Sequence, residues 1–161
     1  MLKFEEVAPE ARIQYLDLLL VGDEDPAMLS RYLSTGTLFA ALDDQVPVGV
    51  AMVVPVDEQT IELKNLAVAP ARRRQGIASG LLRHVGLVYA TQQYQEILVG
   101  TGDVDFDNLR FYMRRGFRLD SIRKHFFDQY SQPVYADGLK LQDMLVLRRK
   151  LLLTRENETK E

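Results

Sequence analysis

The sequence predicts an α+β fold of three layers, in which a mixed, mostly antiparallel sheet of about seven strands carries helices on both faces. Three observations support this prediction. Strand hairpins come early in the chain, an alternation of strands and helices follows, and two further strands close it. Strands joined by short turns pair antiparallel, whereas strands joined through a helix pair parallel, so the sheet should be mixed.

The first 36 residues are expected to form one strand and two helices. A short strand covers residues 2–7, and Pro9 suits the first turn of a helix in which apolar residues recur at helical spacing. A second helix follows Asp25 and Pro26 and should end near Gly36.

Three strands should follow as a meander. Residues 37–44 and 46–56 are rich in β-branched and apolar residues and flank a polar turn at 43–45, which is typical of a hairpin. Residues 60–68 form the next predicted strand and should pair with the one before it through the polar turn at 57–59.

The clearest predicted helix runs from about residue 74 to residue 90. Its apolar residues recur every three or four positions, at Ile77, Leu81, Val85 and Val88. The apolar run 96–102 is typical of a strand inside a sheet. Asp105 is expected to cap a helix over residues 106–114, which Gly116 ends.

Two strands, over residues 117–123 and 139–151, are predicted to complete the sheet, with an aromatic segment at 125–138 between them. The chain contains no internal repeat or linker, so residues 1–153 are expected to form a single domain. Residues 154–161 have the polar composition of a frayed tail.

Composition excludes several classes of function. The formal net charge of −3 argues against a general binder of nucleic acid or of membrane surfaces, because such proteins are normally basic. The absence of cysteine excludes disulfides and thiolate chemistry, and the two histidines, His84 and His125, fit no metal-ligand spacing. We therefore expect a cytoplasmic protein without a metal.

One loop stands out against this acidic background. Arg72, Arg73 and Arg74 lie where a strand gives way to a helix, and Gly76 follows them. A helix start offers unpaired N–H groups and about half a positive charge, so it binds anions such as phosphate. Cations have the wrong sign for this end of a helix, which favours a bound anion over a merely solvated basic turn. The loop matches neither the P-loop nor the dinucleotide fingerprint.

Two stretches of the chain resemble the GNAT superfamily of acetyl-CoA-dependent N-acetyltransferases. Residues 73–78, RRQGIA, match its [R/Q]-x-x-G-x-[G/A] signature, and residues 111–117, FYMRRGF, are similar to its second motif, an aromatic helix that ends in Gly-Phe. The order of strands also resembles the GNAT fold. The match covers most of the chain, fits loosely over the first 35 residues, and is closest to bacterial members without an assigned substrate.

The resemblance implies acetyl-CoA as co-substrate, with its pyrophosphate at this helix start and its pantetheine arm along the strand before it. Many family members carry an asparagine seven residues before the helical tyrosine. This chain has Asp105 there, and Asn108 is the expected substitute. Arg115 is expected at the ribose phosphate, with a solvated helix end as the alternative. The predicted acetyl-CoA contacts are Leu66, Ala67, Val68, Arg73, Arg74, Gln75, Gly76, Ile77, Ala78, Ser79, Asn108 and Arg115.

The resemblance also implies two catalytic residues. Acetyl transfer needs an amine that has lost its proton, and Glu62, on the strand before the loop, is the candidate base, acting directly or through water. The alternative is a solvent-exposed glutamate facing Lys64. Tyr112 is the candidate acid that protonates the departing thiolate, and the alternative is an ordinary core aromatic. Without cysteine, the acetyl group should pass directly to the amine in a ternary complex.

The acceptor is a small-molecule or peptide amine whose identity stays open among aminoglycosides, polyamines, amino acids and protein N-termini. Aromatic and acidic residues between 125 and 143 are candidates for its pocket, or else form a satellite cluster or a homodimer contact. The competing function is that of a non-catalytic acyl-CoA sensor or scaffold with the same fold.

Overall fold

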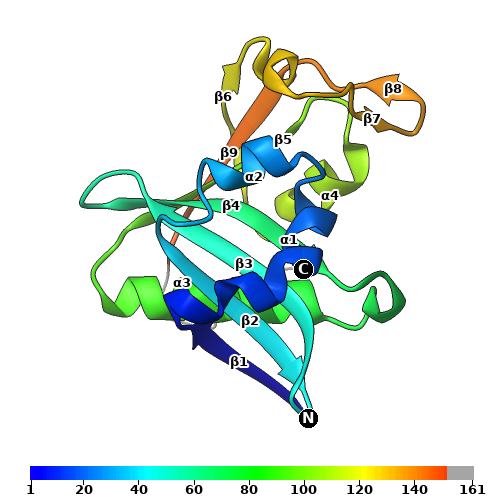
Figure 1. Ribbon diagram of the computed structural model, residues 1–161. Coiled ribbons are helices and arrows are strands. Elements are labelled where there is room, and N and C mark those ends of the chain that lie inside the picture. The colour runs from blue at the N-terminus through cyan, green and yellow to red at the C-terminus, as the bar shows by residue number, and fades with distance from the viewer. Residues whose placement is uncertain (152–161) are drawn as a thin grey trace.

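In the computed structural model, which describes residues 1–151, seven strands form one sheet in the order β1-β2-β3-β4-β5-β9-β6 (Figure 1). Only β4 and β5 pair in parallel, and the other neighbours are antiparallel, as predicted. The strands are β1 (Leu2–Val7), β2 (Thr37–Asp43), β3 (Val46–Pro55), β4 (Thr60–Val68), β5 (Glu96–Gly102), β6 (Arg118–Arg123) and β9 (Met144–Lys150). The predicted polar tail lies outside the described residues.

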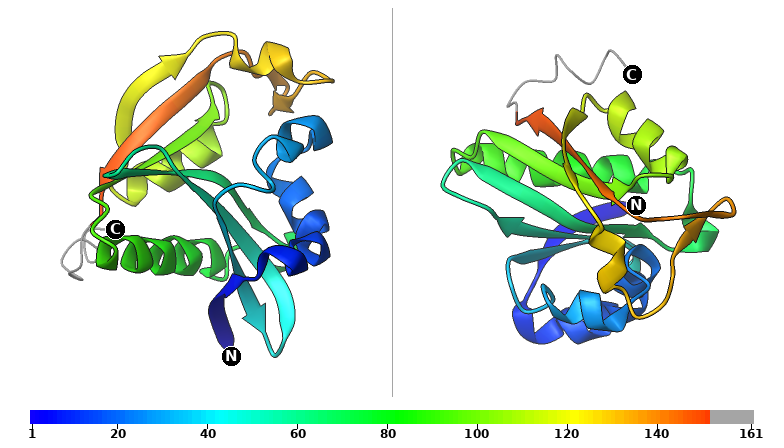
Figure 2. Two further views of the ribbon diagram at one scale, coloured as in Figure 1. Left: turned by 60° about the vertical axis from the view of Figure 1, so that its left-hand side comes forward. Right: turned by 90° about the horizontal axis from the view of Figure 1, so that it is seen from above.

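Helices cover both faces of the sheet, which confirms the three-layer prediction (Figure 2). The N-terminal helices lie on one face, and they are η1 (Pro9–Tyr15), α1 (Leu16–Gly22) and α2 (Pro26–Ser30). The longer helices α3 (Ile77–Thr91) and α4 (Phe106–Arg114) lie on the other. Two further 3-10 turns are η2 (Pro70–Arg72) and η3 (Phe126–Gln129).

The helix predicted from Asp25 to near Gly36 is wrong in length, because α2 ends at Ser30. Residues 31–36 form turns instead, and the buried Arg12 guanidinium donates to the carbonyls of Leu33, Thr35 and Gly36 there. This contact spans more than twenty residues, so local periodicity does not reveal it. The predicted first helix is likewise divided, into the 3-10 segment η1 and the short α1.

The single strand predicted over residues 139–151 is also wrong. It is split into β8 (Leu139–Lys140), which pairs with β7 (Tyr135–Ala136) in a separate hairpin, and the sheet strand β9. Between them, the amide of Gln142 donates to the Asp103 carboxylate and the carbonyl of Asp143 accepts from the Asp103 amide. These bonds to the loop after β5 turn the chain away from the sheet.

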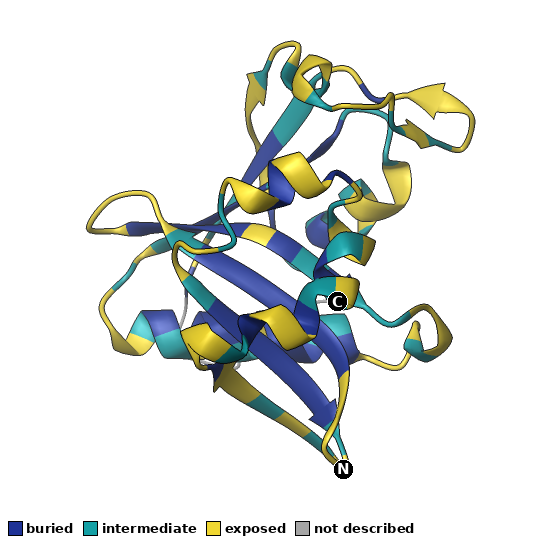
Figure 3. Cartoon of the chain, viewed as in Figure 1, coloured by how far each residue is buried: buried dark blue, intermediate teal, exposed yellow. Residues whose placement is uncertain are grey.

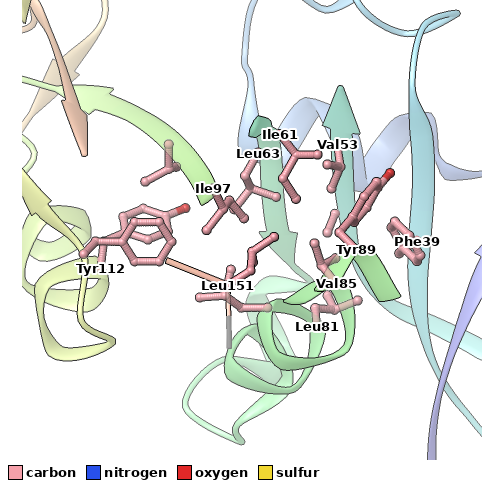
Figure 4. Packing of buried hydrophobic residues seen from close by; sticks show 14 of the residues in the cluster. Phe39, Val53, Ile61, Leu63, Leu81, Val85, Tyr89, Ile97, Tyr112 and Leu151 are labelled. Carbon is pink, nitrogen blue, oxygen red and sulfur yellow. The ribbon is translucent and has the colours of Figure 1, made fainter. Parts of the chain in front are cut away.

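Two hydrophobic clusters hold the layers together, one on each face of the sheet. Figure 3 shows that the central strands of the sheet are largely buried. The larger lies between the sheet and the helices α3 and α4, and Figure 4 shows Tyr112 at its α4 side and Tyr89 on α3. The smaller lies between the sheet and η1, α1 and α2, with Leu19 and Leu38 fully buried. The sheet is therefore buried on both faces at its centre.

A bulge in β4 changes the face of the sheet to which its later side chains point. Val53 of β3 pairs with Leu63 and the adjacent Met52 pairs with Asn65, so Lys64 has no partner residue on β3. As a result Glu62 and Asn65 share the face that carries α1, although they are three residues apart. Ile61 and Leu63 point to the opposite face, as predicted.

Candidate active site

The parallel strands β4 and β5 separate halfway along their length. They pair only over Thr60–Leu63 and Glu96–Val99, after which β4 continues against β3 and β5 against β9. The edge of β4 over residues 64–68, here named the open edge, has no strand partner on its β5 side within the described part of the chain. Backbone amides on such an edge are free to pair with an extended ligand. The predicted pantetheine contacts Leu66, Ala67 and Val68 lie on it.

The start of α3 lies a short loop beyond the open edge. Gly76 is its N-cap residue and adopts a left-handed backbone with φ of 79°. No side chain caps the first turn, which contains no acidic residue, so its N–H groups keep their bonding capacity. The space over Gly76 is open, since a Cβ placed there would meet no atom within 4 Å. Ile77 is buried in the larger cluster and anchors this helix start to the core.

The three arginines of the loop have different roles. Arg72 pairs with Asp43 at 2.7 Å and donates to the Gln75 side chain at 2.9 Å, so it fastens the loop to the β2–β3 hairpin. Arg73 and Arg74 are exposed, and within residues 1–151 they form no ion pair. Arg74 has a left-handed backbone with φ of 62°. The loop therefore presents two cations and a bare helix start in one place.

The end of α4 is tied to the first turn of α3. The Arg115 guanidinium donates to the Ser79 hydroxyl and to the carbonyl of Phe111, and it lies 3.8 Å from the centre of the Phe111 ring. This contact brings the helix that carries Tyr112 next to the candidate phosphate site. Ala78 and Ser79 are half-buried at this junction.

Tyr112 is buried on α4, between the rings of Phe111 and Phe117. Burial raises the pKa of its phenol well above the usual value, and the negative charge of Asp105 adds to the increase. The phenol is consequently protonated at neutral pH. No hydrogen bond joins its hydroxyl to another residue among 1–151, so it is available as a donor.

Asp105 and Asn108 form the first turn of α4. The Asp105 carboxylate accepts from the Asn108 amide and from its side chain, at 3.3 and 2.9 Å, which is the predicted cap. Burial raises the pKa of Asp105. Asn108 is exposed and engaged with this carboxylate rather than standing free for a ligand.

Glu62 is only 5% exposed, so the alternative of a solvent-exposed glutamate is wrong, although its predicted contact with Lys64 exists. Its carboxylate lies 2.6 Å from Lys64 Nζ and 2.7 Å from an Arg123 nitrogen. Although desolvation opposes ionisation, the hydrogen bonds and charges of these two cations prevail and lower the pKa of Glu62. Glu62 is therefore ionised at neutral pH.

Sequence reasoning missed Arg123 as a partner of Glu62. Arg123 is on β6 and Glu62 is on β4, and two strands lie between them in the sheet. Nothing in the local sequence indicates this contact, because it depends on how β6 returns beside β9.

A second polar group on the α1 face was also missed. Asn65 donates to the hydroxyl of Tyr32 at 3.1 Å, and Tyr32 donates to the Asp23 carboxylate at 3.1 Å. Burial raises the pKa of Asp23, and none of the ion pairs among residues 1–151 includes it.

Part of the segment predicted for the acceptor lies near Asp23. Ser131 donates to Asp25, the N-cap of α2, which is two residues after Asp23. The rings just before Ser131, those of Phe126, Phe127 and Tyr130, contact one another.

The acidic residues proposed from the sequence for this side are mostly occupied. Asp143 accepts from the His125 amide and pairs with Lys124, and Asp128 lies 3.5 Å from the His125 ring. Asp137 is in the exposed β7–β8 turn, where Tyr135 is 60% exposed. These residues do not gather into one pocket wall.

The described residues fit acetyl-CoA at three points. The uncapped start of α3 with Arg73 and Arg74 suits a pyrophosphate, and the open edge suits the amides of a pantetheine arm. The third point is the hydroxyl of Thr101 on β5, which is buried without a hydrogen-bond partner. By strand alternation it lies on the same face of β5 as Ile97 and Val99. A buried hydroxyl without a partner can form a hydrogen bond with a polar group of a ligand.

The structure gives no indication of a membrane span or metal centre in the part it describes. Within residues 1–151 no helix is long and apolar enough to cross a membrane. No group of three or more potential metal-ligating side chains occurs in the same range.

Comparison with known proteins agrees with this geometry. Residues 34–119 match the model of the acetyltransferase (GNAT) domain family. An uncharacterised N-acetyltransferase of Bacillus subtilis, YvbK, is 27% identical over 143 residues, which cover 88% of this chain and 92% of that protein.

Two solved structures superpose over nearly the whole chain. One is a GNAT family acetyltransferase from Elizabethkingia anophelis with acetyl-CoA bound, with 34% identity, a TM-score of 0.87 and coverage of 93% of this chain and 98% of that one. The other is a Bacillus subtilis acetyltransferase in complex with CoA, with 27% identity, a TM-score of 0.85 and coverage of 94% and 100%. The family motifs, the parted strands β4 and β5 and these relatives lead to one conclusion: the chain belongs to the GNAT family and is an N-acetyltransferase.

Proposed function

We propose that this enzyme moves an acetyl group from acetyl-CoA to a primary amine by direct attack in a ternary complex. The observation that carries the proposal is the juxtaposition of an uncapped helix start, an open strand edge and a buried, protonated tyrosine on an adjoining helix. The pyrophosphate binds at the start of α3, where the amides of Gln75 to Ser79 face it and Arg73 and Arg74 add charge. Arg115, which is tied to Ser79, contributes at the edge of this site, whereas Asn108 is occupied by Asp105.

The order of β4 and α3 along the chain gives the direction in which the cofactor would lie. Because α3 comes after the C-terminal end of β4, an arm that starts at the pyrophosphate runs back along Val68, Ala67 and Leu66. Its thioester then lies where β4 and β5 meet, beside Glu62. A backbone N–H of the open edge stabilises the negative charge that develops on the carbonyl oxygen.

Glu62 and Tyr112 divide the proton transfers. A lysine-like ammonium has a pKa of about 10.4. The pKa of Glu62, despite its burial, is lowered by Arg123 and Lys64, so Glu62 is far too weak a base to hold the proton of such an amine. Glu62 therefore acts as the anion that orients the amine, or a water beside it, while the proton moves on to solvent. Tyr112 stays protonated and delivers its proton to the CoA thiolate as the carbon–sulfur bond breaks.

The test is acetyl-CoA-dependent thiol release with a panel of amines, comparing wild type with Tyr112→Phe. We expect turnover with one class of amine and a loss of about a hundredfold in the variant, with acetyl-CoA binding retained. Tyr89→Phe is the matched control, because Tyr89 is a buried tyrosine of the same cluster on α3 (Figure 4).

Each other outcome has a distinct meaning. Full activity in Tyr112→Phe would overturn the role of the acid. Binding of acetyl-CoA without turnover of any amine would favour the competing function, an acyl-CoA sensor or scaffold.

A further inference from the structure

An amine of the protein itself occupies the position expected for the acceptor. Lys64 Nζ lies 2.6 Å from Glu62 Oε2, the carboxylate that the proposed function assigns to the acceptor amine. Lys64 is also the bulge residue of β4 and the first residue of the open edge, where the two strands part. Its side chain is 32% exposed, so solvent and ligands reach it.

We infer that Lys64 is a site of self-acetylation, in which the enzyme transfers an acetyl group from its own bound acetyl-CoA to Lys64 Nζ. The inference rests on the proposed function, because it uses the thioester position derived there. An arm that runs from the start of α3 along Val68 and Leu66 ends beside Lys64. Amine, carboxylate and thioester then meet within one short stretch of β4.

The reaction balances without a further reactant. Lys64 loses one proton to solvent through a water beside Glu62, and the nitrogen lone pair attacks the thioester carbonyl carbon. The nitrogen–carbon bond forms, the carbon–sulfur bond breaks, and the electron pair leaves on sulfur. The second proton of the nitrogen ends on sulfur through Tyr112, which gives acetyl-lysine, CoA thiol and one proton in solvent.

The modification would change the surroundings of Glu62. An acetylated Lys64 has no positive charge, so Arg123 would be the remaining cation of this group. Glu62 would lose one of the two charges that favour its ionised form and would bind a cationic amine more strongly. Self-acetylation would thus alter the site before the first external acceptor arrives.

The experiment incubates the purified wild-type chain with acetyl-CoA alone and measures acetylation of each lysine by mass spectrometry over time. Lys124 serves as the control within the same sample, because it also contacts a carboxylate, Asp143, but lies outside the open edge and is 70% exposed. Chemical acetylation would favour Lys124, the more exposed amine. Catalysed acetylation favours Lys64, with a rate at least tenfold higher that does not depend on protein concentration.

Variants separate catalysis from proximity. Tyr112→Phe should slow modification of Lys64 about a hundredfold and leave that of Lys124 unchanged. Lys64→Arg should remove the signal at this position and keep the charge beside Glu62. Equal rates at Lys64 and Lys124, or rates unchanged by Tyr112→Phe, would overturn the inference.

The outcomes also distinguish this inference from the proposed function. An unmodified Lys64 in a protein that acetylates external amines would refute self-acetylation alone. Failure to bind acetyl-CoA, measured by calorimetry on the same preparation, would refute both.

Discussion

At the scale of single residues, two carboxylates between β4 and α1 differ in their partners. One belongs to Glu62 of β4 and the other to Asp23, the residue that follows α1. Glu62 lies between two cations, which lower its pKa, whereas Asp23 accepts from the hydroxyl of Tyr32 and has its pKa raised by burial. Asn65, on the same face of β4 as Glu62, donates to the hydroxyl of Tyr32. If the acceptor amine lies beside Glu62 as proposed, a carboxylate on this face without an ion-pair partner among residues 1–151 favours a substrate with positive charge.

The pKa shifts predict an unusual pH profile. Glu62, with a lowered pKa, is ionised and Tyr112, with a raised pKa, is protonated throughout pH 6–9, so neither contributes an inflection there. We expect kcat/KM to rise with pH until the acceptor amine loses its own proton. Profiles for two acceptors with different amine pKa values should be displaced by that difference. An inflection near pH 7 that both acceptors share would show that another group of the enzyme titrates.

Arg123 should contribute to stability through Glu62. Arg123→Met removes one charged hydrogen-bond partner from a buried carboxylate, and we expect a loss of about 1–2 kcal/mol in the free energy of unfolding at pH 7. Arg110→Met is the control, since Arg110 forms an exposed pair with Asp107, and its effect should stay below about 0.5 kcal/mol. Urea unfolding measures both variants.

The Arg123 effect should depend on pH. The folded pKa of Glu62 is lower than its unfolded value of about 4.3, so the stabilisation is present above that pH and is lost as pH falls through the folded pKa. The difference between wild type and Arg123→Met should therefore shrink below about pH 4. A difference that stayed constant into acid would mean that Arg123 acts through packing alone.

At the scale of elements, the start of α3 combines a left-handed backbone at Gly76 with the proposed phosphate site. Gly76→Ala places a Cβ on a left-handed residue without a steric clash, so its folding cost is the backbone term of about 1–2 kcal/mol. Gly138→Ala is closely matched, because Gly138 has φ of 78° and equally open space in the β7–β8 turn. Thermal unfolding should report similar losses of stability for both.

Only one of these glycines should affect the cofactor. The Cβ of Gly76→Ala points into the space where the pyrophosphate would approach, so acetyl-CoA affinity should fall at least tenfold, as calorimetry would show. Gly138→Ala should bind acetyl-CoA as wild type does. Equal affinities in both variants would contradict the phosphate site at Gly76.

The elements also show what sequence could and could not predict. The strands over residues 37–68 and 96–102 follow from local composition, because their turns are polar and their apolar runs continuous. The loop with Arg73 and Gly76 was predictable for the same reason, since strand, turn and helix are adjacent in sequence. The pairing of Glu62 with Arg123 and the bonds from Arg12 to residues 33–36 were not, because they join distant segments.

At the scale of the whole molecule, the region proposed for the acceptor joins two segments that are far apart in the sequence. Asp25 caps α2 and also accepts from the amide of Ser131, 106 residues further on. Arg31 donates to Gln129 across the same boundary. The N-terminal helices and the aromatic segment near Phe126 thus hold each other in place, and no single stretch of the chain encodes this junction.

Acetyl-CoA should stabilise the entire fold, because its proposed site joins β4, α3 and α4. At a concentration one hundred times its dissociation constant, a ligand of the folded state adds about 2.7 kcal/mol. For a chain of this length that corresponds to an increase in Tm of about 5–10 °C. A thermal scan with and without acetyl-CoA measures the shift, and pantetheine, which lacks the phosphates and the adenosine of CoA, should produce far less. Equal shifts in Tm with both ligands would contradict the proposed phosphate site at the start of α3.

The bulge at Lys64 gives β4 one residue more than its pairing with β3 requires. Because Leu63 and Asn65 already lie opposite consecutive residues of β3, a chain without Lys64 would keep every later side chain of β4 on its present face. Both hydrophobic clusters would survive such a deletion. What would disappear is the bulge, which stands at the position where the pairing of β4 with β5 ends. The core of this fold is thus compatible with a shorter strand, and the surplus residue brings a cation to Glu62 at the point where β4 and β5 part.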